Sequence, residues 1–156
     1  MFVGLIVGFG ALLATTTAHA QSLVAFDATA HQLTAVSSVC NGDVCEFVFE
    51  GRGTVNIMGS VTVTIDVVQD LSGDPCDPYT SEATFVGATG SITISDTAGW
   101  VCPSATHFGR PGTIQGVSTV TGGTGQFSGI IGAGADQGTF TGNGEPNVHV
   151  TGIVVY

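Results

Sequence analysis

Two acidic side chains and one of the chain's two arginines lie close together in an alternating segment. Glu46, Glu50 and Arg52 are separated by even numbers of residues, so an extended strand places all three on one face. If that face pointed into a closed sheet, the group would hold a polar ligand or act on it, because burial raises the pKa of a carboxyl group towards values useful for proton transfer. The opposite face is apolar, so a solvent-exposed outer face is the alternative.

A second set of candidate residues lies in the segment Thr97–Gly112, which we interpret as a loop bordered by glycine and proline. It contains Trp100, His107 and Arg110. Loops at the mouth of a barrel often carry binding residues, so we expect these three side chains at the rim of a ligand site. The alternative is an ordinary loop held by a disulfide. No G-x-S-x-G motif supports serine catalysis, and no catalytic residue is assigned.

Three aspartates lie in the predicted main loop Asp70–Ser81. Asp70, Asp74 and Asp77 have oxygen donors that would suit Ca²⁺, but their spacing does not match an EF-hand. We therefore expect a solvated acidic loop, with no metal site and no cofactor.

Four cysteines allow three disulfide pairings, and the sequence alone does not choose among them. The turn signal Asn41-Gly42-Asp43 favours a bond between Cys40 and Cys45. Cys76 and Cys102 flank a predicted hairpin and would meet at its open end. The chain has no C-x-x-C pair, so a cysteine metal site is disfavoured.

The first 20 residues have the pattern of a secretory signal peptide. Phe2–Leu13 is apolar and too short to cross a bilayer, and Ala18-His19-Ala20 is an A-x-A cleavage signal. The alternative is a buried N-terminal strand. We expect cleavage after Ala20, one domain over residues 21–156, a secreted or periplasmic location and no stable membrane anchor after cleavage.

The amino-acid composition excludes some classes of function for this chain. The formal net charge is −10, with only two basic residues, so the chain cannot neutralise many phosphates and nucleic-acid binding is excluded. Anionic membrane surfaces are disfavoured for the same reason. Hydrophobic residues make up 43% and charged residues 9%, which is unlike a disordered acidic tail, and the abundant Val, Ile, Phe and Thr favour β-structure.

Alternating apolar residues predict most of the strands. Val61, Val63, Ile65 and Val67 mark a half-buried strand. The segment 46–57 alternates in the same way and is interrupted by Gly51 and Gly53, which predicts a bend. Further strands are expected at Glu82–Val86, Ser91–Ser95, Thr113–Thr121, Gln126–Ala135, Thr139–Thr141 and Val148–Tyr156, with one or two more in Ser22–Ser38.

The fold class is therefore all-β, with eight or nine strands and no convincing helix. Glycines recur at short intervals within Thr121–Gly142, and mid-strand glycine is a means of curling a sheet until it closes. We predict a single antiparallel β-barrel, with a β-sandwich as the alternative.

The segment Gly122-Gly123-Thr124-Gly125-Gln126-Phe127 resembles the G-G-T-G-x-F signature of plant dirigent proteins. With Ser128-Gly129-Ile130-Ile131-Gly132 it is similar to allene oxide cyclase-like barrels, among them small exported bacterial proteins. The resemblance implies an eight-stranded barrel with an apolar cavity. It also implies structural roles for Gly122, Gly123, Gly125, Phe127, Gly129 and Gly132. Ile131 stands where dirigent proteins have arginine, so no catalytic residue is carried over.

These observations lead to an exported barrel that encloses a small apolar ligand and has no evident catalytic residues. One alternative is a cyclase or isomerase whose barrel shapes an apolar substrate, since orientation alone contributes much of a rate enhancement. Another alternative is a surface or matrix-interaction protein.

Overall fold

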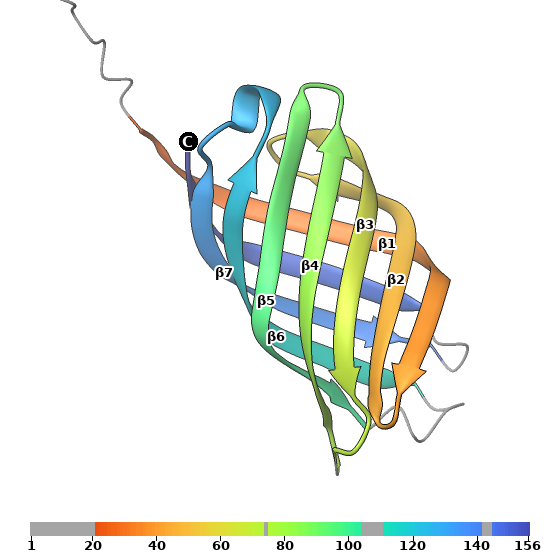
Figure 1. Ribbon diagram of the computed structural model, residues 1–156. Coiled ribbons are helices and arrows are strands. Elements are labelled where there is room, and N and C mark those ends of the chain that lie inside the picture. Colours follow the sequence, from red (N-terminus) through yellow and green to blue (C-terminus); the bar gives the residue numbers. More distant parts are fainter. Residues whose placement is uncertain (1–20, 74, 104–110, 142–144) are drawn as a thin grey trace, which may run out of the picture.

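The computed structural model describes residues 21–73, 75–103, 111–141 and 145–156, and in these ranges nearly all of the chain is β-strand (Figure 1). The strands are β1 (Leu23–Asn41), β2 (Val44–Val55), β3 (Gly59–Asp70), β4 (Asp77–Gly87), β5 (Gly90–Cys102), β6 (Gly112–Gly123), β7 (Ile131–Phe140) and β8 (Pro146–Val155). A short 3-10 turn, η2 (Gly125–Phe127), lies between β6 and β7. No helix in the described ranges is long and apolar enough to cross a membrane.

The eight strands form one closed antiparallel barrel in sequence order. Each strand pairs with the next along the chain, and β8 pairs with β1 from Leu23↔Val155 to Ala30↔Val148. The predicted all-β barrel is thus confirmed in preference to the sandwich.

Apolar side chains that face inward fill one half of the barrel. Val61, Val63 and Ile65 of β3 are buried, as their alternation predicts. They pack with residues of the other strands into a continuous core. We call the end of the barrel that this core fills the η2 end, because η2 and the β4–β5 turn lie there (Figure 1).

The glycine-rich segment after β6 closes the η2 end. Thr124 accepts a hydrogen bond from the Ser91 amide at 3.1 Å through its hydroxyl, and its own amide donates to the Ser91 carbonyl at 2.9 Å. Gly125 has a φ of +62°, and a Cβ on it would lie 2.2 Å from the Thr89 carbonyl oxygen. The resulting turn buries Phe127 completely, and Phe127 meets Tyr156 edge-on with ring centroids 5.8 Å apart.

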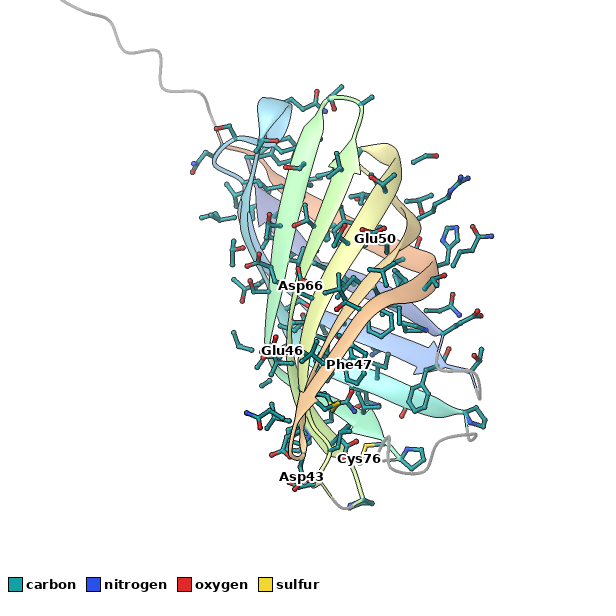
Figure 2. All side chains as sticks on the ribbon, turned by 45° about the vertical axis from the view of Figure 1, so that its right-hand side comes forward. Asp43, Glu46, Phe47, Glu50, Asp66 and Cys76 are labelled. Atoms are coloured by element: carbon teal, nitrogen blue, oxygen red, sulfur yellow. A yellow bond between two sulfur atoms is a disulfide. The ribbon has the colours of Figure 1, made fainter. Side chains whose placement is uncertain are left out.

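Both predicted disulfides are confirmed. Cys40 is bonded to Cys45 across the β1–β2 turn, and Cys76 is bonded to Cys102 beside the start of β4 and the end of β5. They lie at the end of the barrel opposite η2, which we call the disulfide end; Figure 2 shows Asp43 and Cys76 there. Two disulfides are consistent with an oxidising environment.

Several predicted boundaries are wrong. Gln126 and Phe127 belong to η2, and β7 runs without a break from Ile131 to Phe140, so no separate strand exists at Thr139–Thr141. Within Ser22–Ser38, where one or two strands were expected, residues 23–38 belong to the single strand β1, whose pairing with β2 shifts twice.

The two predicted loops are shorter than expected, because the pairing between β4 and β5 continues as far as Asp77↔Val101. Residues 77–81 and 97–102 are therefore strand and not loop. The pairing shifts register between Tyr79 and Ser81. Because of this shift the alternation of residues along the sequence is irregular, and the sequence pattern did not indicate the pairing.

Inward-facing glycines let neighbouring strands approach closely. A Cβ on Gly53 would lie 2.1 Å from the Thr29 carbonyl oxygen, and one on Gly134 would lie 2.3 Å from that of Thr151. No side chain fits in such a space, so these positions permit the sharp coiling that a small closed barrel needs.

We predict that Gly134→Ala lowers the free energy of unfolding by about 1–3 kcal/mol, because a backbone carbonyl of β8 must move. Gly122→Ala is the matched control in the same glycine-rich stretch, since a Cβ there meets nothing within 4 Å. It should be neutral or slightly stabilising. Urea unfolding of both variants tests this, and equal losses would contradict the role given to close approach.

Candidate functional site

The inner face of the barrel changes from apolar to polar towards the disulfide end. On β4 the inward positions Phe85 and Ala83 are followed by Ser81, Tyr79 and Asp77. The neighbouring strands contribute further buried polar residues at the same level, namely Asp96 of β5, Ser118 of β6 and Asp136 of β7. The pairings Ser81↔Asp96 and Asp96↔Ser118 bring three of these residues together.

Asp96 is fully engaged within this polar cluster. Its Oδ2 accepts a hydrogen bond from the Ser81 hydroxyl at 2.5 Å, and its Oδ1 accepts one from the Ser118 hydroxyl at 2.6 Å. Both carboxyl oxygens of this buried residue therefore have a hydroxyl donor.

Asp136 is only half engaged. The Tyr79 hydroxyl donates a hydrogen bond to Asp136 Oδ2, but Asp136 Oδ1 has no hydrogen-bond partner among the described residues. The side chain is 1% exposed. A buried acceptor without a donor costs about 1–3 kcal/mol, so this atom is either a source of strain or a place for a ligand group.

Two glycines make room for the Tyr79–Asp136 pair. A Cβ on Gly99 would lie 2.2 Å from the Tyr79 ring, and a Cβ on Gly116 would lie 2.2 Å from Asp136 Oδ1. The Tyr79 ring and Asp136 Oδ1 thus occupy the space that side chains at Gly99 and Gly116 would need.

Burial shifts the pKa values of both partners. Burial is the main cause that raises the pKa of Asp136, and the charge of Asp96 adds to it; the hydrogen bond from Tyr79 opposes it, as do the residue's own amide and the nearby Ser118 hydroxyl. Burial also raises the pKa of Tyr79, and the hydrogen bond to Asp136 raises it further, so the phenol stays a neutral donor.

A second polar pair lies nearer the disulfide end. Gln69 Nε2 donates to Asp77 Oδ2 at 3.1 Å, and Asp77 is completely buried. The prediction that Asp77 belongs to a solvated loop is wrong, because β4 begins at this residue and turns it inward. Asp70 accepts hydrogen bonds from Ser72, and Asp74 lies outside the described residues.

Aromatic residues surround this part of the interior. Phe47 and Phe49 share the inward parity of buried Cys45 and are half-buried, with ring centroids 6.2 Å apart. Phe140 is also half-buried, and its ring occupies the place of a Cβ on Gly112. The inner surface here combines aromatic faces with a few polar atoms, as ligand sites do.

The candidates Glu50 and Arg52 point outward. They are exposed on β2, and no ion pair joins them in the described part of the chain. They line a hollow of about 520 Å³ on the outer surface where β1 bulges, together with Gln32, Thr34, Thr62 and Thr64. Figure 2 shows Glu46, Glu50 and Asp66 along this side. A role for Glu50 in the interior is therefore wrong.

Trp100 lies on β5 and is 53% exposed on the outer surface, and not in a loop at the rim. His107 and Arg110 lie outside the described residues. Among the residues that the structure describes, no three His, Cys, Asp or Glu side chains come together in a way that could hold a metal ion.

Sequence reasoning missed Tyr79, Asp96 and Asp136. For Tyr79 a signal was available, because Asp77, Tyr79 and Ser81 continue the alternation of Ala83 and Phe85. The segment Asp70–Ser81 was interpreted as a loop because it contains Pro78 and Cys76.

The chain was compared with known proteins. No protein-family model matches it, and no curated protein matches it. Among solved structures it is similar to a pyocyanin demethylase, with 16% sequence identity and a TM-score of 0.39, covering 83% of this chain and 98% of that chain. At this level of similarity the comparison assigns no substrate and no residue role.

The raised pKa of Asp136 predicts a pH dependence of stability. Because the folded state favours the protonated form, this contribution is fully present below the usual pKa of 3.8 and is lost as the pH rises through the folded pKa. The side chain of Asp136→Asn is neutral at every pH. The difference in the free energy of unfolding between this variant and the native chain should therefore grow in favour of the variant above about pH 4. It should grow by about 1.4 kcal/mol for each pH unit by which the folded pKa exceeds its usual value, and then level off. Urea unfolding from acidic to neutral pH measures this difference; a constant or falling difference would contradict it.

Tyr79→Phe removes the described donor to Asp136. We expect a loss of about 1–3 kcal/mol in the free energy of unfolding, since a buried acceptor is left unpaired. Tyr156→Phe is the control, because Tyr156 is 39% exposed and its ring contact with Phe127 is kept. Similar losses of the free energy of unfolding in both variants would contradict the stabilising role of the Tyr79–Asp136 hydrogen bond.

Proposed function

We propose that the barrel binds one small molecule in the part of its interior nearer the disulfide end. The observation that carries this proposal is the buried Asp136 Oδ1, which has no hydrogen-bond partner among the described residues. A ligand that donates a hydrogen bond to this oxygen would remove the cost of leaving it unpaired.

The charge of the interior indicates which polar group the ligand carries. Asp77, Asp96 and Asp136 face inward, whereas Arg52 is exposed outside and the chain has no lysine. A positively charged or N–H-bearing group would find no described cation competing for Asp136. An anionic ligand would meet the further carboxyl groups of Asp77 and Asp96 and no described cation, so its burial would be costly.

The rest of the ligand is apolar. Phe47, Phe49 and Phe140 present half-buried rings, and Val148 packs beside the core. By contrast, the completely buried Phe127 fills the η2 end. The sequence led us to expect a small apolar ligand. The interior side chains refine this expectation to an apolar or aromatic molecule with one hydrogen-bond donor.

An isomerase or cyclase is the second candidate, and the raised pKa of Asp136 is the observation that favours it. A carboxyl group whose pKa is raised by burial keeps its proton to a higher pH than an exposed one, which suits a general acid, and Tyr79 would hold it in place. A reaction that only relocates a proton within the substrate needs no cofactor.

The cellular setting is part of the same proposal. A signal peptide over residues 1–20 and two disulfides support export to a secreted or periplasmic location. The closed eight-stranded barrel supports membership of the allene oxide cyclase-like and dirigent-like group.

Three probes that share one ring test the ligand class: benzylamine, benzyl alcohol and benzoate. We expect affinity to fall in that order, measured by NMR chemical-shift changes of interior residues. Asp136→Asn should remove the advantage of benzylamine over benzyl alcohol, whereas the outward-facing Asp66→Asn should keep it. Binding of benzoate as tight as that of benzylamine, or no shift at Phe49 and Tyr79 with any probe, would overturn the proposal.

A further inference from the structure

The outer surface of the barrel carries a hollow that the interior ligand site does not use. It has a volume of about 520 Å³ and lies over β1, β2 and β3. We call it the outer hollow, and Figure 2 shows Glu50 on this side of the molecule. Its polar lining residues are Gln32, Thr34, Glu50, Arg52, Thr62 and Thr64.

The outer hollow lies at a bulge in β1. Between its pairs with Arg52 and Glu50, β1 has two residues where β2 has only Gly51. One of the two, Gln32, has a φ of +53°, and among the residues that the structure describes it is the one non-glycine residue with a positive φ. A Cβ on Gly51 would lie 2.8 Å from the Gln32 carbonyl oxygen, so the bulge packs directly against β2. Backbone strain of this kind is concentrated at binding sites and active sites.

The outer hollow contains one charge of each sign. Glu50 and Arg52 both point outward from β2, and no ion pair involves either of them in the described part of the chain. Arg52 is the only Lys or Arg residue that the structure describes, because the chain has no lysine and Arg110 lies outside the described residues. A ligand that carries both an ammonium and a carboxylate would therefore find a partner for each group here.

The charge of the whole chain favours a ligand without net charge. At a net charge of −10 the chain repels anions, and a cation would find carboxylates at many other places on the surface. A zwitterion is not repelled, and Glu50 with Arg52 gives it both partners in one place. No aromatic residue lines the hollow among those that the structure describes, so a sugar ring has no described aromatic face to stack on.

The spacing of the two charged residues matches the length of a dipeptide. Glu50 and Arg52 are two residues apart on a strand, which corresponds to about 6.6 Å along the backbone. An extended dipeptide has about the same length between its terminal ammonium and carboxylate, because its residues have the same rise. A free amino acid is about half as long, and a tripeptide is about half as long again.

We propose that the outer hollow binds a dipeptide with free termini, with the ammonium at Glu50 and the carboxylate at Arg52. Thr34 and Thr64 pair with Glu50 from either side, so two hydroxyl groups lie next to the ammonium end. The Gln32 amide has a donor and an acceptor for the peptide group between the termini. A volume of about 520 Å³ also leaves room for the side chains of the dipeptide.

Three probes without side chains test the proposal: glycylglycine, N-acetyl-glycylglycine and glycylglycinamide. NMR spectra of the residue 21–156 protein at pH 7 and low salt should show glycylglycine shifting the amide signals of Gln32, Gly51 and Thr64. Blocking either terminus should weaken binding by about twofold to fivefold, the range expected for the loss of one exposed ion pair. Glycine and triglycine should also bind more weakly, because neither spans the two charges correctly.

Three results with these probes would overturn the proposal. One is no shift at the three amides with glycylglycine up to about 50 mM. Another is equal binding of the blocked and unblocked peptides, or of glycine and glycylglycine. The third is a set of shifts confined to Phe49 and Tyr79, which would indicate binding in the interior of the barrel and not in the outer hollow.

Two variants assign the termini of the dipeptide to their partners. Glu50→Gln should weaken glycylglycine but leave the acetylated peptide unchanged, because that peptide has no ammonium. Arg52→Gln should weaken glycylglycine but leave glycylglycinamide unchanged, because that peptide has no carboxylate. Glu82→Gln is the matched control, since Glu82 is exposed on β4 and does not line the hollow. Equal weakening by Glu82→Gln, or loss of binding to all three probes in Glu50→Gln, would contradict the assignment.

Discussion

Eight strands close into a narrow barrel only where the sheet bends sharply, and here the bend depends on carbonyl groups that pass directly over glycine Cα atoms. Gly53 receives the Thr29 carbonyl in this way, and Gly132 and Gly134 receive those of Ile153 and Thr151. The pairs β1–β2 and β7–β8 flank the closing pair β1–β8. The close approach of these backbones therefore brings the first and last strands into the positions in which the barrel closes.

Glycines also determine the structure of the polar part of the interior, nearer the disulfide end. Gly99 and Gly116 leave space on β5 and β6, and the Tyr79 ring and the Asp136 carboxylate lie in it. A barrel with larger residues at these two positions would have to expel the tyrosine or the acid. Glycine thus has two roles in this chain, one in bending the sheet and one in admitting a polar pair to its interior.

The sequence predicts the architecture better than the site. Alternation identifies the buried valines of β3, and a turn signal identifies the Cys40–Cys45 bond, because both depend on neighbours along the chain. The Tyr79–Asp136 contact joins residues 57 positions apart, and it depends on register shifts that local patterns do not contain. Glu50 and Arg52 were correctly placed on one face, but alternation alone cannot tell the inside of a barrel from the outside.

The pairing of β1 with β8 has a consequence for how the chain reaches its folded state. Leu23 to Ala30 find their partners only in residues 148–155, so one edge of β1 lacks its backbone partners until the last strand is available. Contacts so distant in sequence slow folding and leave strand edges open to other chains. During synthesis, this protein therefore passes through a stage in which its curved sheet is still open and the free edge of β1 is available to other chains.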